Sequence, residues 1–321
     1  MADKRNGSAG SMAAIENIGF EEDYNFSQLQ KMKFPRLHWV VEGIIVEGLT
    51  ILAARPKLGK SWMMLDVLIA AATGGKALSS IKCQRMVALY YALEDNQRRL
   101  LRRGQKLLKG EWPKDLYVRH KLRRLDRGGI DDIREWVEER KADLVVIDTF
   151  NHIRPPRKLN EEAYSSDYQW LGQLQALATE LKISIVVVHH VRKAEATDPL
   201  DLINGSTGLQ AAADTLLVLT RDSDGVVLHG SGKDLEDQIE LAIEFDRDAC
   251  KWSVLGPAEH ARLSPERKSV LEVLRNAENP LGPTEIAKAV DKRTGSVTKM
   301  LYDMTKAGQL RKTSRGLYEP T

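Results

Sequence analysis

A loop with phosphate-binding residue types lies between an apolar run and a helical stretch near the start of the chain. Apolar and β-branched residues fill positions 49–53, and a helical pattern runs from Lys60 to Thr73, where Gly74 stops it. The loop fits the phosphate-loop spacing at every fixed position except the first, where alanine replaces glycine. It consists of Ala54, Arg55, Pro56, Lys57, Leu58, Gly59, Lys60 and Ser61, and Trp62 follows it.

Each fixed residue of this loop has a chemical role in binding phosphate. Backbone N–H groups curl around a β-phosphate, the helix N-terminus adds partial positive charge, and Gly59 permits close backbone approach. Lys60 supplies a cation for the β- and γ-phosphates, and the Ser61 hydroxyl ligates Mg²⁺. A chance Gly-Lys-Ser at a helix start is the alternative, but the strand before the loop and an acidic strand end later in the chain argue against it. We therefore expect residues 54–62 to bind ATP together with Mg²⁺.

An aspartate ends an apolar run in the middle of the chain. Asp148 follows residues 144–147, which are all aliphatic, in the form of the second nucleotide-binding motif. A carboxylate at this position holds Mg²⁺, whereas an aspartate at a strand end can also serve only as a turn or helix cap. The phosphate loop upstream favours Mg²⁺, so we expect Ser61 and Asp148 to be the metal-binding residues.

The residue that activates water must lie elsewhere, because Thr149 rather than glutamate follows Asp148. Glu94 ends the buried run 87–93 and precedes Asp95. A carboxylate at the tip of the strand beside the phosphate loop can orient a water towards the γ-phosphate. Either carboxylate could instead cap the helix that follows. We assign the general base to Glu94 and the helix cap to Asp95.

A histidine pair, His189 and His190, ends another apolar run, residues 183–188. The carboxyl ends of parallel strands face the ligand crevice, so a neutral imidazole there could hydrogen-bond the γ-phosphate and report its loss. A satisfied core histidine is the alternative for either residue. Neighbours on a strand point to opposite faces, and we choose His190 as the catalytic sensor.

Apolar runs alternate with helical patterns over most of the chain. Strands are expected at 44–46, 49–53, 86–93, 144–147, 183–188 and 215–219, and helices at 60–73, 96–109 and 166–181. Such alternation predicts an α/β fold with a mostly parallel sheet that is covered by helices on both faces. Three later segments, 225–229, 239–245 and 252–254, are expected to add antiparallel strands at one edge, and Leu255-Gly256-Pro257 to mark a domain boundary.

Six short motifs occur in a fixed order: Pro56-Lys57-Leu58-Gly59-Lys60-Ser61, Leu93-Glu94-Asp95, Val145-Val146-Ile147-Asp148, His190-Val191-Arg192-Lys193, Gly205-Ser206-Thr207 and Gly232-Lys233-Asp234. Together they resemble the RepA-like family of RecA-fold P-loop ATPases, which includes replicative hexameric helicases of plasmids and phages. The resemblance covers residues 36–256. It implies a RecA-like fold and a homo-oligomeric ring, with a hexamer expected and ATP between subunits. It also agrees with Glu94 as base and His190 as sensor.

The motif around Lys233 lies past the other nucleotide motifs, between two of the late strands. A cation near the γ-phosphate aids phosphoryl transfer and can come from a neighbouring subunit. Lys233 is our candidate for this catalytic role, with Arg221 as a competitor and an exposed hairpin lysine as the alternative. Relatives in the RepA-like family commonly have arginine where Lys233 stands.

The end of the chain has the pattern of a winged helix. Helices are expected from Pro265, over 285–290 and over 294–307, followed by a wing made of 310–313 and 317–318. From Arg262 onward there are 12 Lys/Arg against 7 Asp/Glu, whereas the rest of the chain has 36 against 38. This basic appendage favours DNA as a partner, with protein–protein contact as the alternative. Candidate DNA contacts are Lys292, Arg293, Thr294, Ser296, Lys299 and Arg315.

Two loops that leave the sheet near the nucleotide carry further cations. Arg154, Arg157 and Lys158 lie on one loop, and Arg192 and Lys193 begin the other. In a ring these side chains could follow the phosphates of a single DNA strand. Residues 97–127 contain 12 Lys/Arg and only 3 Asp/Glu, but we interpret that stretch as a solvated helix face.

The composition excludes other classes of protein. The 321 residues are 42% hydrophobic and 29% charged, with no apolar run of membrane-spanning length and no signal-peptide core. Cys83 and Cys250 are far apart and lack metal-ligand spacing, which favours a reducing, cytoplasmic location. The expected organisation is a flexible arm over residues 1–33, a RecA-like ATPase domain over 34–257 and a winged-helix domain over 262–321.

These features predict an ATP-hydrolysing, oligomeric, DNA-binding motor, and specifically a replicative DNA helicase of a mobile element. The alternative is an ATP-dependent DNA-binding factor that does not unwind DNA, such as a recombination mediator or a regulatory assembly factor. The motifs do not separate the two, because translocation depends on ring geometry and loop motion.

Overall fold

The computed structural model describes residues 24–156, 163–191, 198–206, 208–222, 225–258, 265–277, 279–306, 309–313 and 316–320. The chain divides into two compact units, residues 1–37 and residues 38–321. In the first unit, a capping box closes the start of the short helix α1 (Phe26–Leu29), because Asn25 and Gln28 exchange side-chain to backbone hydrogen bonds. Residues 1–23 of the expected arm lie outside the described residues.

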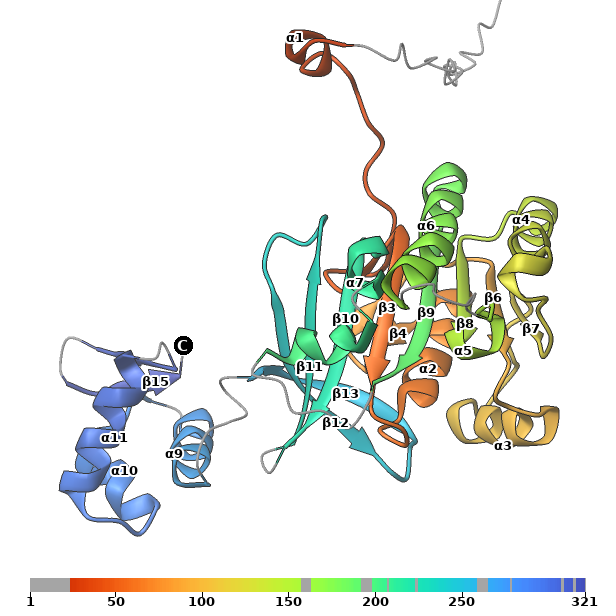
Figure 1. Ribbon diagram of the computed structural model, residues 1–321. Coiled ribbons are helices and arrows are strands. Elements are labelled where there is room, and N and C mark those ends of the chain that lie inside the picture. The colour runs from red at the N-terminus through yellow and green to blue at the C-terminus, as the bar shows by residue number, and fades with distance from the viewer. Residues whose placement is uncertain are drawn as a thin grey trace, which may run out of the picture. The chain divides into compact units, whose positions relative to one another are not determined.

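One large sheet forms the centre of the second unit (Figure 1). Its described strands lie in the order β13-β12-β11-β10-β3-β9-β8-β6-β7. Neighbours from β10 to β7 are parallel, whereas the pairs from β10 to β13 are antiparallel. The strands are β3 (Gly48–Ala54), β6 (Ala88–Ala92), β7 (Leu116–Arg119), β8 (Leu144–Asp148), β9 (Ser184–His190), β10 (Thr215–Arg221), β11 (Val226–Gly232), β12 (Ile239–Asp246) and β13 (Lys251–Pro257). This confirms the predicted sheet and its antiparallel edge.

Helices cover both faces of this sheet, as Figure 1 shows. Helix α2 (Lys60–Thr73) packs on one face, and α4 (Gly129–Arg140) and α6 (Ala163–Leu181) pack on the other. Strands β3, β6 and β8 have every residue buried, which is why they appear in the sequence as continuous apolar runs. Shorter elements connect the strands: α3 (Gln97–Leu107), α5 (Phe150–Ile153), α7 (Gly208–Ala212) and the 3₁₀ turns Leu125–Arg127 and Pro199–Ser206.

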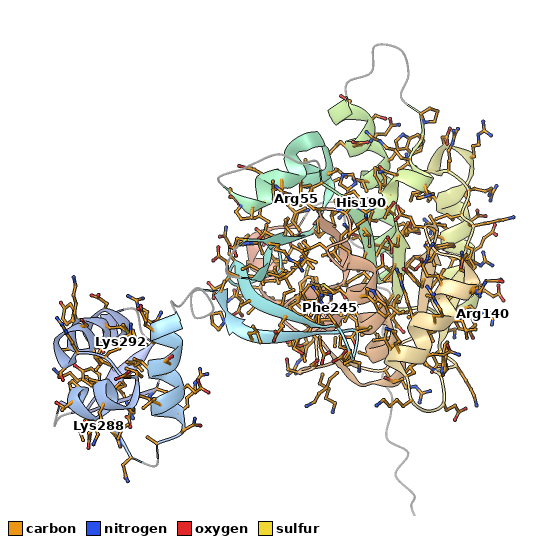
Figure 2. All side chains as sticks on the ribbon, turned by 90° about the horizontal axis from the view of Figure 1, so that it is seen from below. Arg55, Arg140, His190, Phe245, Lys288 and Lys292 are labelled. Atoms are coloured by element: carbon orange, nitrogen blue, oxygen red, sulfur yellow. The ribbon has the colours of Figure 1, made fainter. Side chains whose placement is uncertain are left out.

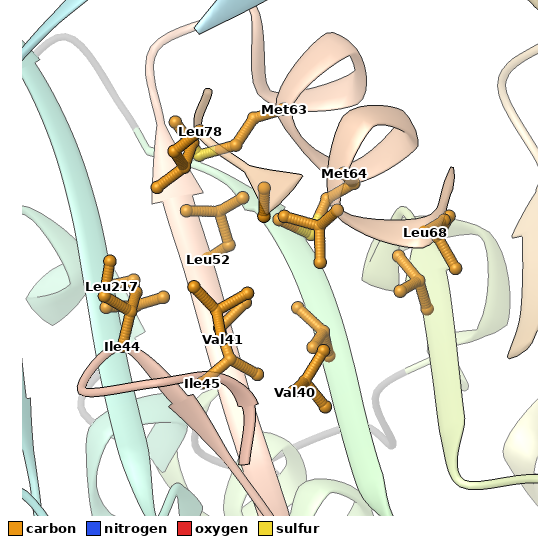
Figure 3. Packing of buried hydrophobic residues seen from close by; sticks show 14 of the residues in the cluster. Val40, Val41, Ile44, Ile45, Leu52, Met63, Met64, Leu68, Leu78 and Leu217 are labelled. Atoms are coloured by element: carbon orange, nitrogen blue, oxygen red, sulfur yellow. The ribbon is translucent and has the colours of Figure 1, made fainter. Parts of the chain in front are cut away.

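A hairpin before β3 seals the face that carries α2. Its strands are β1 (Trp39–Val41) and β2 (Ile45–Val46), paired antiparallel. Side chains from the hairpin, from β3 and β10, and from α2 form one core (Figure 3); they include Val40, Val41, Ile44, Ile45, Leu52, Leu217, Met63, Met64 and Leu68. A second short hairpin, β4 (Lys76–Ala77) and β5 (Ile81–Lys82), follows α2.

The structure contains two elements between β6 and β8 that were not predicted from the sequence. β7 is an edge strand with partly exposed side chains, so it gives no apolar run. Helix α4 buries Ile133, Trp136 and Val137 at helical spacing, a pattern that the sequence does contain. The predicted boundary at residues 255–257 is the end of strand β13, where a register shift beside Ala242 marks a β-bulge.

The last part of the chain has a small core of its own. Helices α9 (Pro265–Arg275), α10 (Pro283–Ala289) and α11 (Thr294–Lys306) precede a hairpin of β14 (Leu310–Lys312) and β15 (Tyr318–Pro320). Val270, Ile286, Val297, Leu301 and Tyr318 are buried together. These elements occupy the expected ranges, and their assignment to the winged-helix class stays a prediction.

None of the helices in the described ranges combines the length and apolar character that crossing a bilayer requires.

Candidate active site

The carboxyl ends of four parallel strands meet at one edge of the sheet. Ala54 at the end of β3 pairs with His190 at the end of β9, so Arg55 and His190 lie side by side (Figure 2). Asp148 ends β8, which lies between β9 and β6. Glu94 follows β6 closely. The phosphate loop and the three candidate side chains therefore come together, because parallel strands bring their carboxyl ends to one edge.

The phosphate loop turns between β3 and α2 with two residues in left-handed conformations. Gly59 has a φ of 99° and Lys57 a φ of 64°. A Cβ atom added at Gly59 would also lie 2.9 Å from Cζ2 of Trp252 in β13. Both constraints favour glycine at this position. The Trp252 indole N–H donates to the Gly59 carbonyl oxygen at 3.2 Å, so the antiparallel edge of the sheet supports the loop.

Lys60 is buried in the first turn of α2, with 4% of its surface exposed. Its ammonium donates to the carbonyl oxygens of Ala54 (2.8 Å) and Arg55 (3.2 Å) and to Nδ1 of His190 (3.1 Å). Burial lowers the pKa of Lys60 to about 8, although the negative charges of Asp148 and Glu94 act in the opposite direction. At neutral pH the side chain is therefore a cation that is held against the loop.

Asp148 is a buried carboxylate with one oxygen engaged. Its Oδ2 accepts a hydrogen bond from the Tyr90 hydroxyl at 2.9 Å, and its Oδ1 is buried with no hydrogen-bond partner among the described residues. Burial raises the pKa of Asp148, while the hydroxyls of Ser61 and Tyr90 lower it. A buried carboxylate oxygen without a partner is unfavourable, and a cation beside it would relieve that cost.

Ser61 and Asp148 fit Mg²⁺, which prefers hydroxyl and carboxylate oxygens. The described residues contain no group of three His, Cys, Asp or Glu side chains suited to hold a metal ion. An ion held by Ser61 and Asp148 would therefore draw its other ligands from water and from substrate phosphates, as Mg²⁺ usually does.

His190 connects Lys60 to Glu94. An ammonium group can only donate, so Nδ1 of His190 accepts from Lys60 and Nε2 carries the proton. This Nε2–H donates to Oε1 of Glu94 at 3.4 Å, and the Thr149 hydroxyl donates to the same oxygen at 2.9 Å. Two donors thus hold Oε1, whereas Oε2 has no hydrogen-bond partner among the described residues. The Glu94 side chain is 39% exposed, so water can reach the free oxygen. A carboxylate held in this way can accept a proton from that water.

Asp95 does not cap helix α3, so that prediction is wrong. The N-cap is Asn96, whose side chain accepts a hydrogen bond from the backbone N–H of Arg99 at 2.8 Å. Asp95 instead forms ion pairs with Arg99 at 2.8 Å and with Arg103, and only 6% of its side chain is exposed. These pairs tie the residue after Glu94 to α3.

His189 belongs to the core rather than to the site. Its ring packs edge-on against Phe150, with the centroids 6.4 Å apart. Burial lowers the pKa of His189 to about 4, so the ring is neutral, and its Nδ1 is buried without a hydrogen-bond partner among the described residues. Strand alternation therefore brings His190, and not His189, to Lys60 and Glu94.

The two candidate cations for a role in trans lie at opposite ends of β10. Arg221 ends the strand and lines a pocket of about 360 Å³ together with loop residues 55–58. Lys233 follows β11, whose end pairs with the start of β10. Its ammonium donates to Asp214 at 2.8 Å, and 64% of its side chain is exposed. Lys233 therefore lies away from the phosphate loop of its own chain.

The candidate DNA contacts fall only partly within the described residues. Arg157, Lys158, Arg192, Lys193 and Arg315 lie outside them. Arg154 donates to the fully buried Asp167 at 2.7 Å. Lys292, labelled in Figure 2, pairs with Glu266 at 2.8 Å. Exposed positions around the start of α11 are Arg293, Thr294, Ser296 and Lys299.

Sequence reasoning missed three residues that shape the site: Tyr90, Thr149 and Trp252. The contact of Tyr90 spans 58 positions and that of Trp252 spans 193, so no local pattern reveals them. Thr149 stands out in the sequence only because it is not glutamate; its hydroxyl and its place after Asp148 were the available signals.

Comparisons with known proteins identify the family and the fold. The family described as AAA domain matches residues 20–196, which is more than half of the chain. Among solved structures, the chain is similar to one described as an ATPase domain, with 16% identity, a TM-score of 0.50, and coverage of 65% of this chain and 85% of that one. It is also similar to a KaiC-like protein from the hyperthermophilic archaeon Pyrococcus horikoshii OT3, with 14% identity, a TM-score of 0.44, and coverage of 67% and 93%. No curated protein matches. The first structural likeness confirms the predicted RecA-like fold.

Proposed function

The chain belongs to the AAA domain family and is a P-loop ATPase, and we propose that it works as an oligomeric, DNA-engaging motor. A replicative DNA helicase of a plasmid, phage or other mobile element is the specific form of this proposal. A factor that hydrolyses ATP on DNA without unwinding it is the competing form, and the experiment below separates the two.

The contact set around Glu94 is the observation that carries the proposal. Thr149 and His190 both donate to Oε1 of Glu94, and His190 also accepts from Lys60. Oε2 is thereby left to accept the proton of the attacking water. The backbone of residues 55–61 binds phosphate, and Lys60 neutralises its charge. Mg²⁺ held by Ser61 and Asp148 would supply further charge neutralisation when bound.

His190 lies between the nucleotide site and two cations that are candidates for DNA binding. Its ring contacts both Lys60 and Glu94, so a change of charge at the γ-phosphate alters the hydrogen bonds of the ring. His190 ends β9, and Arg192 and Lys193 follow it within three residues. A shift of the ring would therefore reach two cations that are suited to follow the phosphates of a strand.

The position of Lys233 supports an oligomer. Lys233 lies away from its own phosphate loop and is largely exposed, so its cation could act only on the nucleotide of another subunit. Phosphoryl transfer gains from such a cation in trans. The proposal of a ring of subunits, expected to be a hexamer, is based on this position of Lys233 and on the resemblance to the RepA-like family.

The basic C-terminal elements support a second DNA contact. Arg293, Thr294, Ser296 and Lys299 are exposed at the start of α11, where a recognition helix would carry its contacts. Lys292 is less suited to phosphate than the sequence suggested, because Glu266 already pairs with it.

A strand-displacement assay beside an ATPase assay, each with and without single-stranded DNA, tests the proposal. A motor should show DNA-stimulated hydrolysis and should displace a strand from a forked duplex, and the Lys60→Ala variant should do neither. Stimulated hydrolysis without displacement would select the non-unwinding form. Hydrolysis that DNA does not change, in a protein that binds no DNA, would reject both.

A further inference from the structure

His120 lies beside the chain segment that carries Glu94. It directly follows the edge strand β7, which pairs in parallel with β6 as far as Tyr91. Its Nδ1 lies 3.2 Å from the carbonyl oxygen of Ala92 and 3.0 Å from that of Asp95. Carbonyl oxygens only accept hydrogen bonds, so Nδ1 carries the proton and donates to both oxygens in a three-centre bond.

This one N–H group spans the position of the candidate base. Ala92 is the last residue of β6, and Asp95 comes directly after Glu94. The imidazole therefore joins the end of the strand to the turn beyond it, with Glu94 between the two contacts. Because the pairing with β7 ends at Tyr91, the His120 side chain takes over from the strand ladder on this side. The backbone of the segment is thus fixed to the end of β7.

Two further contacts hold the same segment from other elements. The Leu93 N–H donates to the carbonyl oxygen of Asp148 in β8 at 3.0 Å. The guanidinium of Arg99 in α3 donates to the carbonyl oxygen of Glu94 at 3.2 Å. Together with the contacts of His120, these hydrogen bonds come from β8, from α3 and from the end of β7. Three separate elements therefore hold the backbone around Glu94.

The position of this backbone matters for the chemistry that Glu94 can perform. Thr149 and His190 both donate to Oε1, but they act only at the end of the side chain. If the Cα atom of Glu94 moved, Oε2 would move relative to the attacking water. A displacement of about 1 Å between reacting groups can cost about 10²-fold in rate. A partly exposed catalytic carboxylate therefore needs a fixed point of attachment as well as fixed hydrogen bonds.

His120 is remote from the residues that bind phosphate. Strands β6, β8 and β9 lie between β7 and β3, the strand that leads into the phosphate loop (Figure 1). Both carbonyl groups that His120 contacts belong to residues 92–95. An effect of His120 on catalysis would therefore pass through Glu94 and would leave nucleotide affinity unchanged.

We propose that His120 is a positioning residue for ATP hydrolysis, whose Nδ1–H holds the backbone of residues 92–95 so that Oε2 of Glu94 faces the attacking water. The inference rests on the proposed role of Glu94 as general base and deepens it, because it assigns a function to a residue outside the nucleotide motifs. His120 does not exchange a proton in the reaction and acts only through the geometry of Glu94. Loss of its Nδ1–H should slow the chemical step and leave binding intact.

Two amide variants of the full-length protein test this proposal, because they place an N–H donor at different positions. The amide nitrogen of asparagine can lie where Nδ1 lies, whereas that of glutamine reaches the position of Nε2. His120→Gln should lower kcat by about tenfold, with the affinity for a non-hydrolysable ATP analogue within about twofold of the wild type. His120→Asn should keep kcat within about threefold of the wild type. Equal losses of kcat in the two variants would overturn the proposal, since the Nδ1–H would then have no special role.

The double variant His120→Gln, Glu94→Gln shows whether His120 acts through Glu94. In the Glu94→Gln background, His120→Gln should lower kcat by less than about twofold, because the base is already absent. The same tenfold loss in both backgrounds would overturn the proposal, since His120 would then act independently of Glu94. Normal kcat in His120→Gln, beside a large loss in Glu94→Gln, would overturn this inference and leave the proposed base standing. Undiminished turnover by Glu94→Gln would instead reject the base, and the role of His120 with it.

Discussion

The indole N–H of Trp252 donates a hydrogen bond to the carbonyl oxygen of Gly59 at 3.2 Å, across 193 positions of sequence. The same ring fills the space that a side chain at Gly59 would need. Trp252 is fully buried, and its ring packs at a tilt against that of Phe245, with the centroids 5.1 Å apart. The antiparallel strand β13, which comes much later in the sequence, thus supports the conformation of the phosphate loop.

Trp252→Phe should weaken nucleotide binding by about fivefold, because it keeps an aromatic ring and removes one neutral hydrogen bond. Isothermal titration with a non-hydrolysable ATP analogue measures this effect. Trp136→Phe is the matched control, since Trp136 is a buried tryptophan on the opposite face of the sheet. Both variants should lose some stability, but only Trp252→Phe should lose affinity. Unchanged affinity in Trp252→Phe would mean that the loop does not need this support.

Nucleotide affinity should fall at alkaline pH through Lys60. Burial lowers the pKa of Lys60 to about 8 in the free protein, and bound phosphate raises it again because it favours the ammonium form. Binding therefore takes up a proton above about pH 8, and affinity should drop there by up to about tenfold per pH unit. Below about pH 8 the lysine is already charged and contributes no pH dependence.

Titrations with the same ATP analogue at increasing pH measure this dependence. Lys60→Arg is the control, because a guanidinium stays charged throughout the range; its affinity can be weaker but should be flat. A wild-type affinity that stays constant to about pH 9.5 would contradict the role of Lys60 as a cation at the phosphates.

Much of the fold and part of the site follow from local patterns. The strands β3, β6, β8 and β9 are recognisable because burial on both faces demands continuous apolar runs. Parallel order then brings Glu94, Asp148 and His190 to one edge. The contacts of Tyr90 and Trp252 depend on register and packing between distant segments, so the sequence contains no pattern for them. Thr149 could be noticed from its place after Asp148, but its hydrogen bond to Glu94 also depends on strand register. The Gly-Pro pair at residues 256–257 lies beside a β-bulge at the end of β13, and the domain boundary expected there stays a prediction.

Acid should destabilise the protein through His189. Burial lowers the pKa of His189 to about 4, below its ordinary value of 6.5. The unfolded chain therefore binds a proton more readily than the folded protein between these two values, and stability falls as pH falls through this window. The loss should be up to about 1.4 kcal/mol per pH unit.

Denaturant unfolding of the wild type and of His189→Gln at several pH values measures this loss. The variant has no titrating ring at this position, so its stability should fall less steeply below pH 6.5. If the free energy of unfolding falls equally steeply with decreasing pH in the two proteins, protonation of His189 does not contribute to the loss of stability in acid.

Lys233 should act only on a neighbouring subunit. Lys233→Ala should lower turnover by at least about tenfold, as loss of a cation in trans does. Mixing Lys233→Ala with Lys60→Ala should restore some activity, because the first keeps an intact phosphate loop and the second keeps Lys233. Steady-state ATP hydrolysis of each variant and of the mixture measures this complementation.

Lys76→Ala, which removes another exposed lysine, is the control and should behave as the wild type. Normal turnover by Lys233→Ala alone, in a protein that still assembles, would contradict the role in trans. Lys233 would then be only an exposed lysine that pairs with Asp214.

The measurement that tests the account most directly is ATP turnover by Glu94→Gln. The amide keeps the size of the side chain and cannot accept the proton from water. We predict nucleotide affinity close to that of the wild type and turnover lower by about 10²-fold or more. Asp95→Asn is the matched variant, since Asp95 is held in ion pairs rather than open to water. Undiminished turnover by Glu94→Gln, or a larger defect in Asp95→Asn, would contradict the assignment of Glu94 as the general base.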